Sequence, residues 1–227
     1  GARTDKPDFS YVGTPLPIID STFSYGWREV AAAESEGFML DASGRANAMR
    51  KVAEALEGGA LNGYATITVN GNTSYGLRNH PKRNTRSTGV TLNGATGAQW
   101  LAEITATLKL LHADNFKVPA TLYLNWSDWF YATSTEFTTG YPKTIAQRVQ
   151  ELGGIRDIVP ADSINANEVI AIVKDRRAVQ VLNGMPMATT PKMRANPQDD
   201  YEFVTMAAAA VEVKYDKNDN CGIAHSS

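Results

Sequence analysis

The chain has 227 residues, with 22 Lys and Arg against 24 Asp and Glu and a formal net charge of −2. This length fits one globular domain or two small ones, and the charge leaves no overall positive field with which the whole chain could hold a nucleic-acid duplex. A single cysteine, Cys221, excludes an internal disulfide framework and zinc sites that need two thiolates.

No stretch of about 18 apolar residues is present, and the first eight residues lack the apolar core of a signal peptide. We therefore expect a cytoplasmic product without membrane contact, whose stability depends on packing alone.

An extended arm is predicted at the N-terminus. Residues 1–20 show little apolar periodicity and contain three prolines, Pro7, Pro15 and Pro17. Because proline lacks the N–H that a helix or a central strand requires, this segment is expected to lie over another surface.

A hairpin is predicted next. Residues 22–28 alternate, with Phe23, Tyr25 and Trp27 on one face, which is typical of a strand with one aromatic side. After a turn at residues 34–37, the apolar run 38–40 is expected to return antiparallel to this strand.

Three helices are predicted from apolar spacing and capping residues. The first begins at Ser43, with Asp41 or Ser43 as its cap and Gly58-Gly59 as its end, and its apolar face is Ala46, Met49, Val52, Ala53 and Leu56. The second opens with a capping box at Thr96–Gln99, and its face is broad enough to dock on a sheet: Trp100, Leu101, Ile104, Leu108 and Leu111. The third runs from Thr144 to Leu152.

Strands and turns fill the remaining chain. Residues 62–97 are rich in Gly and Asn, and we expect loops and short strands around the turns Asn62-Gly63, Asn70-Gly71 and Asn93-Gly94. Strands are expected at 120–124, 155–159, 169–173 and 178–182. Residues 201–215 alternate throughout and would span roughly 50 Å as one strand, so the strand is either interrupted or extends beyond one compact core.

We assign no catalytic, cofactor-binding or metal-binding residue and expect no enzyme. His112 with Asp114, or Cys221 with His225, lacks further ligands at a metal-site spacing, and the two tail residues are expected at the surface. Six aspartates could include an acid–base pair but are better explained as solvated loop charges: Asp128, Asp157, Asp162, Asp175, Asp199 and Asp200.

One local positive cluster could contact phosphates. It contains Arg78, Lys82, Arg83 and Arg86 around His80, although a solvated loop explains it equally well.

The arm, the aromatic hairpin and the long strand are surfaces that one subunit cannot easily bury. At about 25 cal/mol per Å² of apolar area, covering the aromatic face would favour association by several kcal/mol before entropy costs. Such features call for neighbouring chains.

The order of these elements resembles the Hong Kong 97-type fold shared by major capsid proteins of tailed phages and encapsulin shell proteins. Residues 13–19 look like the N-terminal arm of that family, 41–57 like its long spine helix, 96–113 like the peripheral-domain helix packed beside the spine, and 201–215 like its last peripheral strand.

The resemblance implies an α+β subunit with five regions: an N-terminal arm (1–20), an extended-loop hairpin (21–41), the spine helix and peripheral domain (42–118), an axial domain (119–190), and a return to the peripheral domain with a C-terminal tail (191–227). It also implies an N-terminal segment removed during maturation, which would explain the missing initiator methionine.

The function implied by the resemblance is mechanical. Copies would form pentamers and hexamers of an icosahedral virion capsid that encloses double-stranded DNA, assembled in the host cytoplasm with possible scaffolding, portal and decoration proteins. Two alternatives stay open: an encapsulin compartment around a cargo enzyme, and a small soluble α/β metal-dependent enzyme.

Overall fold

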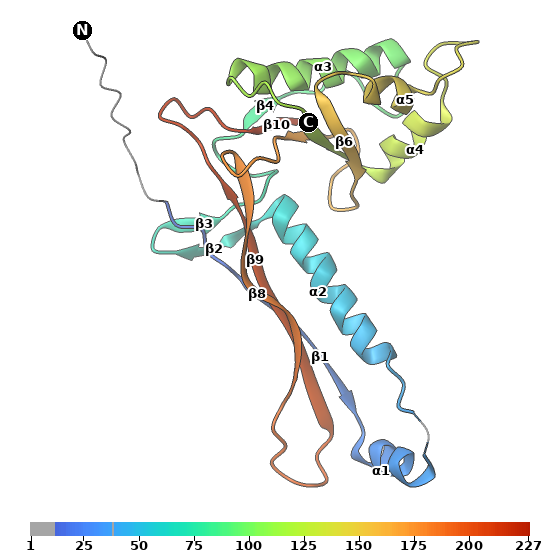
Figure 1. Cartoon of the computed structure of the whole chain (residues 1–227), viewed down its shortest axis with the longest axis vertical. Helices are drawn as coiled ribbons and strands as arrows, with labels where there is room; N and C mark the ends of the chain where they lie inside the picture. The colour runs from blue at the N-terminus through green and yellow to red at the C-terminus, as the bar shows by residue number, and fades with distance from the viewer. Residues whose placement is uncertain (1–11, 38) are drawn as a thin grey trace.

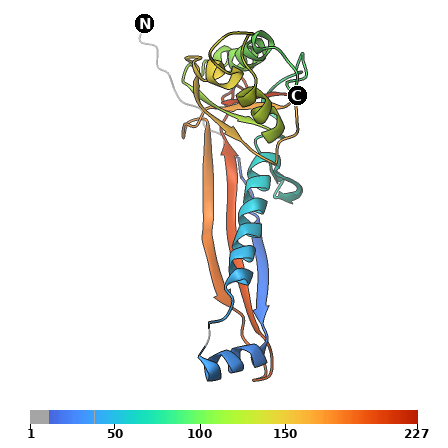
Figure 2. The same cartoon turned by 90° about the vertical axis from the view of Figure 1, so that its right-hand side faces the viewer.

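The computed structural model describes residues 12–37 and 39–227, so the beginning of the predicted arm and Phe38 of the predicted hairpin lie outside the described residues. The described chain divides into a head at one end, a long shaft, and a small distal tip at the other end (Figures 1 and 2).

The shaft is a three-stranded antiparallel sheet covered by one long helix. The strands lie in the order β1 (Ile18–Tyr25), β9 (Tyr201–Val213) and β8 (Val179–Pro191). Helix α2 (Ser43–Asn62) runs along β1 and β9 (Figure 2). The helix sits close to the sheet because small residues lie at the contact. Gly44 lies against the Phe23 ring, and β9 carries four consecutive alanines, 207–210, so the alternate positions of this run that face the helix are small.

The head is built on a five-stranded mixed sheet. Its order is β4 (Asn84–Arg86), β10 (Ile223–Ser226), β7 (Val169–Ile172), β5 (Ala120–Leu124) and β6 (Ile155–Pro160). Helix α3 (Gly97–Ala113) contacts this sheet, and α4 (Trp126–Ser134) and α5 (Ile145–Gln150) complete the head.

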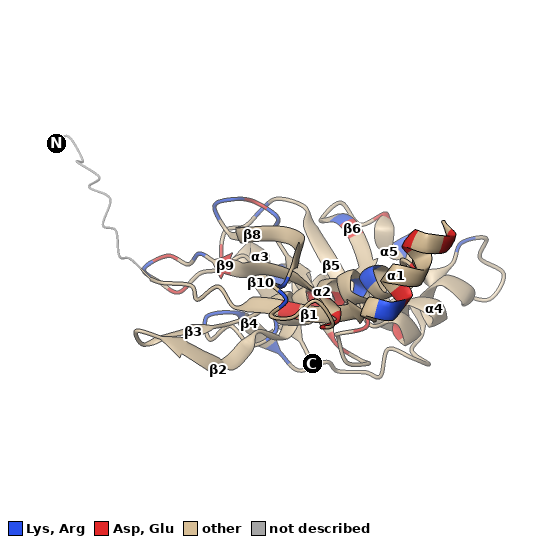
Figure 3. Ribbon diagram, turned by 90° about the horizontal axis from the view of Figure 1, so that it is seen from below, with Lys and Arg blue, Asp and Glu red and all other residues tan. Residues whose placement is uncertain are grey.

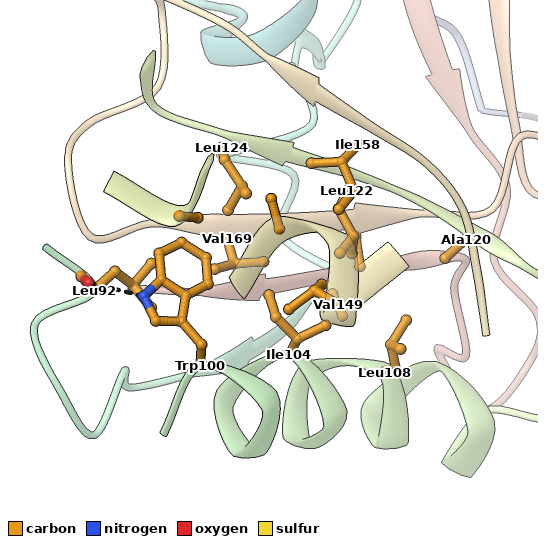
Figure 4. Packing of buried hydrophobic residues seen from close by; sticks show 14 of the residues in the cluster. Leu92, Trp100, Ile104, Leu108, Ala120, Leu122, Leu124, Val149, Ile158 and Val169 are labelled. Carbon is orange, nitrogen blue, oxygen red and sulfur yellow. Dashed lines mark hydrogen bonds between the residues drawn. The ribbon is translucent and has the colours of Figure 1, made fainter. Parts of the chain in front are cut away.

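The main core lies between α3 and the head sheet (Figure 4). Trp100, Ile104, Leu108 and Leu111 of α3 are buried there, as the periodicity predicted. The Trp100 indole N–H donates to the Leu92 carbonyl oxygen at 2.9 Å, which satisfies the one polar atom of this large side chain inside the core.

Local turn and cap signals are confirmed at several positions. The hairpin of β2 (Tyr64–Val69) and β3 (Asn72–Ser74) turns at Asn70 and Gly71, both with positive φ, as an Asn-Gly hairpin turn requires. The capping box at Thr96 forms, because the Thr96 N–H donates to Gln99 Oε1 at 2.9 Å and the Gln99 N–H donates back to Thr96 Oγ1.

The predicted hairpin at residues 21–41 is wrong. The first strand ends at Tyr25 and pairs with β9, and residues 27–36 form helix α1 (Trp27–Glu36), so Trp27 leaves the aromatic face. The Gly26 N–H donates to Glu29 Oε2 at 3.2 Å and thereby starts the helix, which Ala31–Ala33 then favour.

The predicted end and face of the spine-like helix are also corrected. α2 continues through Gly58 and Gly59 to Asn62, because the residue that ends it is Gly63, whose φ of 66° with extended ψ is readily adopted by glycine alone. Val52 is buried and Leu56 half-buried as predicted, whereas Ala46, Met49 and Ala53 are exposed.

Three further differences concern the head. α3 packs on the head sheet rather than beside α2. The strand expected at 178–182 continues to Pro191 and belongs to the shaft. Helix α4 was not predicted, although Asn125 caps it by accepting a hydrogen bond from the Ser127 N–H at 2.8 Å.

Candidate assembly and contact surfaces

The distal tip has little packing of its own. It comprises α1, residues 39–41 and the β8–β9 turn at residues 192–200 (Figure 1). Ala33 is the buried residue of α1, and Met39 is 96% exposed. Met193, in the turn, is also fully exposed.

The tip is nevertheless held in place. The Trp27 N–H donates to Asp200 Oδ1 at 3.2 Å, and the Tyr25 hydroxyl donates to the Asp41 carbonyl oxygen at 2.8 Å. The Arg194 guanidinium lies 3.6 Å from the centroid of the Tyr201 ring. The exposed methionines are therefore presented on an anchored support.

The aromatic face of the first strand is covered within the same chain. Phe23 lies opposite Phe203 in the β1–β9 register, and the two rings stack with centroids 5.2 Å apart. Tyr25 meets Phe203 edge-on at 6.0 Å. The expectation that only neighbouring copies could cover Phe23 and Tyr25 is therefore wrong.

Two other apolar surfaces are open in the subunit. On α4, Trp126 and Phe130 are exposed one helical turn apart, with ring centroids 5.3 Å apart. Between head and shaft lies a hollow of about 680 Å³, whose apolar lining includes Leu61, Leu77, Val159, Ile172, Val179 and Val211.

The predicted phosphate-binding cluster is a set of internal contacts. It lies in what we call the basic loop (residues 78–86), which connects the end of α2 and the β2–β3 hairpin to β4. Arg78 pairs with Glu168 at 2.6 Å, Lys82 with Asp219 at 2.7 Å and Arg86 with Glu103 at 2.5 Å. Arg83 donates to His225 Nδ1 at 3.2 Å. These cations are occupied in holding the head together.

A different set of cations lies at one end of the head sheet, where strands begin or finish; we call this end the cationic edge. Parallel β5 and β6 both start at this edge, and antiparallel β7 ends there, so the topology brings together segments 117–119, 155–156 and 173–177. The resulting sheet-edge cations are all exposed and take part in no ion pair within the described residues: Lys117, Arg156, Lys174, Arg176 and Arg177.

This cationic edge was not predicted from the sequence. The run Lys174-Asp175-Arg176-Arg177 is its one local signal, since Lys117 and Arg156 join it through strand pairing. Arg156 and Lys174 line a shared hollow of about 450 Å³. Asp175 is also exposed and lines this hollow, and its carboxylate accepts from the Arg177 N–H at 2.8 Å.

Charge is mixed on α1 itself. Figure 3, seen from the tip end, shows Lys or Arg next to Asp and Glu on this helix. Arg28 stands beside Trp27 at 5.2 Å from its ring centroid, and the acidic residues are Glu29, Glu34 and Glu36. The tip thus combines exposed apolar side chains with charges of both signs.

The histidines and the cysteine are arranged differently from expectation. His112 is exposed in the last turn of α3, a favourable position beside the helix carbonyl end. Cys221 and His225, expected at the surface, are buried in the head. His80 is buried as well, and this burial, with Arg83 and Lys82 nearby, lowers its pKa to about 4.

No described group of three or more His, Cys, Asp or Glu side chains has a geometry that could hold a metal ion. The aspartates instead support backbone turns. Asp128 is buried, which raises its pKa, and it accepts from the Asn167 N–H at 2.7 Å. Asp199 accepts from the Asn196 N–H at 2.7 Å. Among the described helices, none combines the length and apolar character needed to cross a bilayer.

Comparison with known proteins gives one family match and several structural matches. The model of a family described as "Family of unknown function (DUF6260)" matches residues 1–226, and no curated protein matches the sequence. The capsid of Myoviridae phage XM1 is similar over 100% of this chain and 81% of its own, with TM-score 0.71 and 13% identity.

Two more solved structures have the same arrangement. A virus-like particle from Pyrococcus furiosus matches 94% of this chain and 78% of its own, with TM-score 0.68 and 14% identity. A Mycobacterium phage Che8 chain matches 99% of this chain and 76% of its own, with TM-score 0.63 and 13% identity. The α+β fold is therefore the Hong Kong 97-type fold found in phage capsids and encapsulins, as the sequence predicted.

Proposed function

Because the chain belongs to DUF6260, a family of unknown function, and has the capsid fold, we propose that it is the subunit of a closed protein shell. The observation that carries this proposal is the anchored distal tip, which presents Met39 and Met193 to solvent far from the subunit's own core. Burying a methionine side chain is worth about 1.5–3 kcal/mol, so association would cover a surface that folding leaves open.

The finer part of the proposal is an icosahedral phage head of pentamers and hexamers that encloses double-stranded DNA. The sheet-edge cations support it, because they are exposed, unpaired among the described residues and grouped on one edge. Each neutralised phosphate would release counterions, so binding there would weaken as salt rises.

The experiment is negative-stain microscopy of particles purified after expression of the whole chain, followed by assay of their contents. Closed shells containing nucleic acid are expected. A monomer at high protein concentration would refute the shell, whereas shells containing a protein cargo would identify a nanocompartment and refute only the phage head.

A matched pair of variants tests the DNA contact. Lys174→Glu with Arg176→Glu is expected to leave shell assembly intact and reduce the nucleic acid per particle, because two cations become anions at the sheet edge. The control is Lys51→Glu with Lys109→Glu, two exposed lysines outside this edge. Equal nucleic acid in both particles, or loss of assembly in the first alone, would contradict the assignment.

A further inference from the structure

His225 has an unusual set of neighbours for a buried ring. In the part of the chain that the structure describes, two buried side-chain polar atoms lack a hydrogen-bond partner, Glu168 Oε2 and His225 Nε2. They face each other 3.7 Å apart, which is too long for a hydrogen bond.

The hydrogen bond at the other ring nitrogen, Nδ1, determines which nitrogen of neutral His225 carries the proton. Arg83 Nε donates to His225 Nδ1 at 3.2 Å, and because a guanidinium is always a donor, Nδ1 carries no hydrogen. The neutral ring therefore carries its proton on Nε2, directed at Glu168. The free Glu168 oxygen has no donor of its own, whereas its second oxygen accepts from Arg78 at 2.6 Å.

The charges around the ring favour this neutral form. Burial lowers the pKa of His225, Arg83 and Arg78 of the basic loop lower it further, and Glu168, in the turn before β7, opposes them. The neighbouring strands place Thr85 of β4 and Ile170 of β7 opposite His225, and neither residue ionises near neutral pH.

Protonation would exchange one partner for the other. A proton on Nδ1 would face the Arg83 N–H donor, so that hydrogen bond is lost. The same proton makes the ring cationic and turns the Nε2–H into a charge-assisted donor to the Glu168 carboxylate. A shift of about 0.5–1 Å brings the two atoms from 3.7 Å to hydrogen-bond distance.

We propose that His225 is an acid-sensitive latch: in its neutral form it binds the basic loop through Arg83, and in its protonated form it pairs with Glu168 and releases Arg83. The loop is then loosened at Arg83, while Arg78, Lys82 and Arg86 keep their ion pairs. The sign follows from linkage. In the closed form Arg83 is bound to neutral His225, and in the open form His225 is protonated and Arg83 is released. The closed form binds fewer protons than the open form, so it is favoured at neutral pH and loses stability as pH falls below the ordinary pKa of histidine.

The latch acts on a loop that joins shaft and head. The basic loop starts beside the end of α2, where the Leu77 and Arg78 N–H groups donate to the Ala60 and Leu61 carbonyl oxygens at 3.0 and 2.8 Å. Its far end is β4, at the edge of the head sheet. This inference does not depend on whether the chain forms a shell.

Cys221 provides a reporter for the open form. It is the chain's single thiol, it is buried, and its Sγ donates to the Lys82 carbonyl oxygen of the basic loop at 2.9 Å. Loosening of the loop at Lys82 and Arg83 increases the exposure of this thiol. The probe is 4,4′-dithiodipyridine, which reacts with thiols at mildly acidic pH, and rates are divided by those of the urea-unfolded chain to remove the intrinsic effect of pH.

The normalised rate of the native chain is expected to rise about tenfold between pH 7 and pH 5, because the added proton favours the open form. Circular dichroism must stay unchanged over this range. A flat rate, or a rise that coincides with loss of secondary structure, would overturn the latch without any variant being needed.

Three variants assign the rise to His225. In His225→Gln the amide oxygen can still accept from Arg83 but does not titrate, so the rise is expected to be clearly smaller than in the native chain. His80→Gln removes the other buried ring of the loop, whose lowered pKa adds to the rise, so a part of the rise is expected to remain there; His112→Gln removes an exposed ring and is expected to retain the full rise. An undiminished rise in His225→Gln, or its complete loss in His80→Gln, would contradict the assignment.

Discussion

Arg86 and Glu103 lie 17 residues apart in the sequence and form a two-pronged ion pair, with Arg86 Nη1 on Oε2 at 2.5 Å and Nη2 on Oε1 at 3.1 Å. Glu103 is buried in α3, and Arg86 holds the pKa of its carboxyl below the usual value. A cation that looks available in the sequence is thus committed to a partner on another element. The same applies to Arg78 with Glu168.

At this scale we predict that Glu103→Gln destabilises the subunit by about 3 kcal/mol, because it leaves a partly buried guanidinium without its counter-charge. The free energy of unfolding, measured by urea titration, checks this. The control Glu54→Gln removes the exposed pair with Arg50, whose side chains are 71% and 68% accessible, and should cost less than about 0.5 kcal/mol. Similar losses in the two variants would contradict the prediction.

At the scale of elements, the first strand shows how pairing decides what a pattern means. The aromatic alternation of residues 22–28 is real, yet Gly26 ends the strand and β9 supplies Phe203 as the partner for Phe23. Tyr25→Ala is therefore expected to weaken the folded subunit itself, because this face belongs to the shaft.

The end of α2 depends on two glycines in close contact. Gly63 has φ 66°, and a Cβ there would meet the Gly76 nitrogen at 2.3 Å; the reciprocal Cβ on Gly76 would meet the Gly63 nitrogen at the same distance. These contacts involve backbone atoms, which cannot move aside as a flexible side chain does. The chain crossing between α2 and the basic loop therefore requires glycine at both positions.

We predict that Gly63→Ala prevents stable folding of the subunit, whereas Gly71→Ala costs about 1 kcal/mol. Both positions have positive φ, but Gly71 has nothing within 4 Å of its added Cβ, so the pair separates crowding from backbone strain. Thermal unfolding of both variants is the measurement. Comparable melting temperatures would show that the Gly63 contact is not limiting.

For the whole molecule, the separation of head, shaft and tip is the feature most relevant to the proposed function (Figure 1). The head has a core of its own, and the shaft is held by α2 against one face of its sheet. The tip has anchoring hydrogen bonds but little buried apolar surface. Its exposed side chains therefore contribute to association more than to folding.

We predict that Met39→Asp leaves the unfolding transition within about 0.5 kcal/mol of the native chain, as for an exposed surface position, and abolishes or strongly reduces shell assembly. Light scattering reports particle size, and urea titration reports the subunit. The matched control is Met49→Asp on the outer side of α2, which should still assemble. If Met39→Asp formed normal shells, the prediction that the tip belongs to the assembly surface would be wrong.

The sequence by itself determined the elements whose signals are local. The capping box and apolar face of residues 97–113, the Asn-Gly turn at 70–71 and the long alternation after Tyr201 need no distant partner to be interpreted. The order of such elements along the chain also sufficed to predict the capsid fold.

The tertiary structure alone decided which side chains meet. Whether Arg86 is free, whether Phe23 is covered and whether Lys117, Arg156 and Lys174 form one edge depend on strand pairing between segments far apart in sequence. Burial of His225 beside Glu168 has the same origin, since β10 is inserted between β4 and β7. Charge and burial are properties of neighbours in space, and a single sequence records only neighbours along the chain.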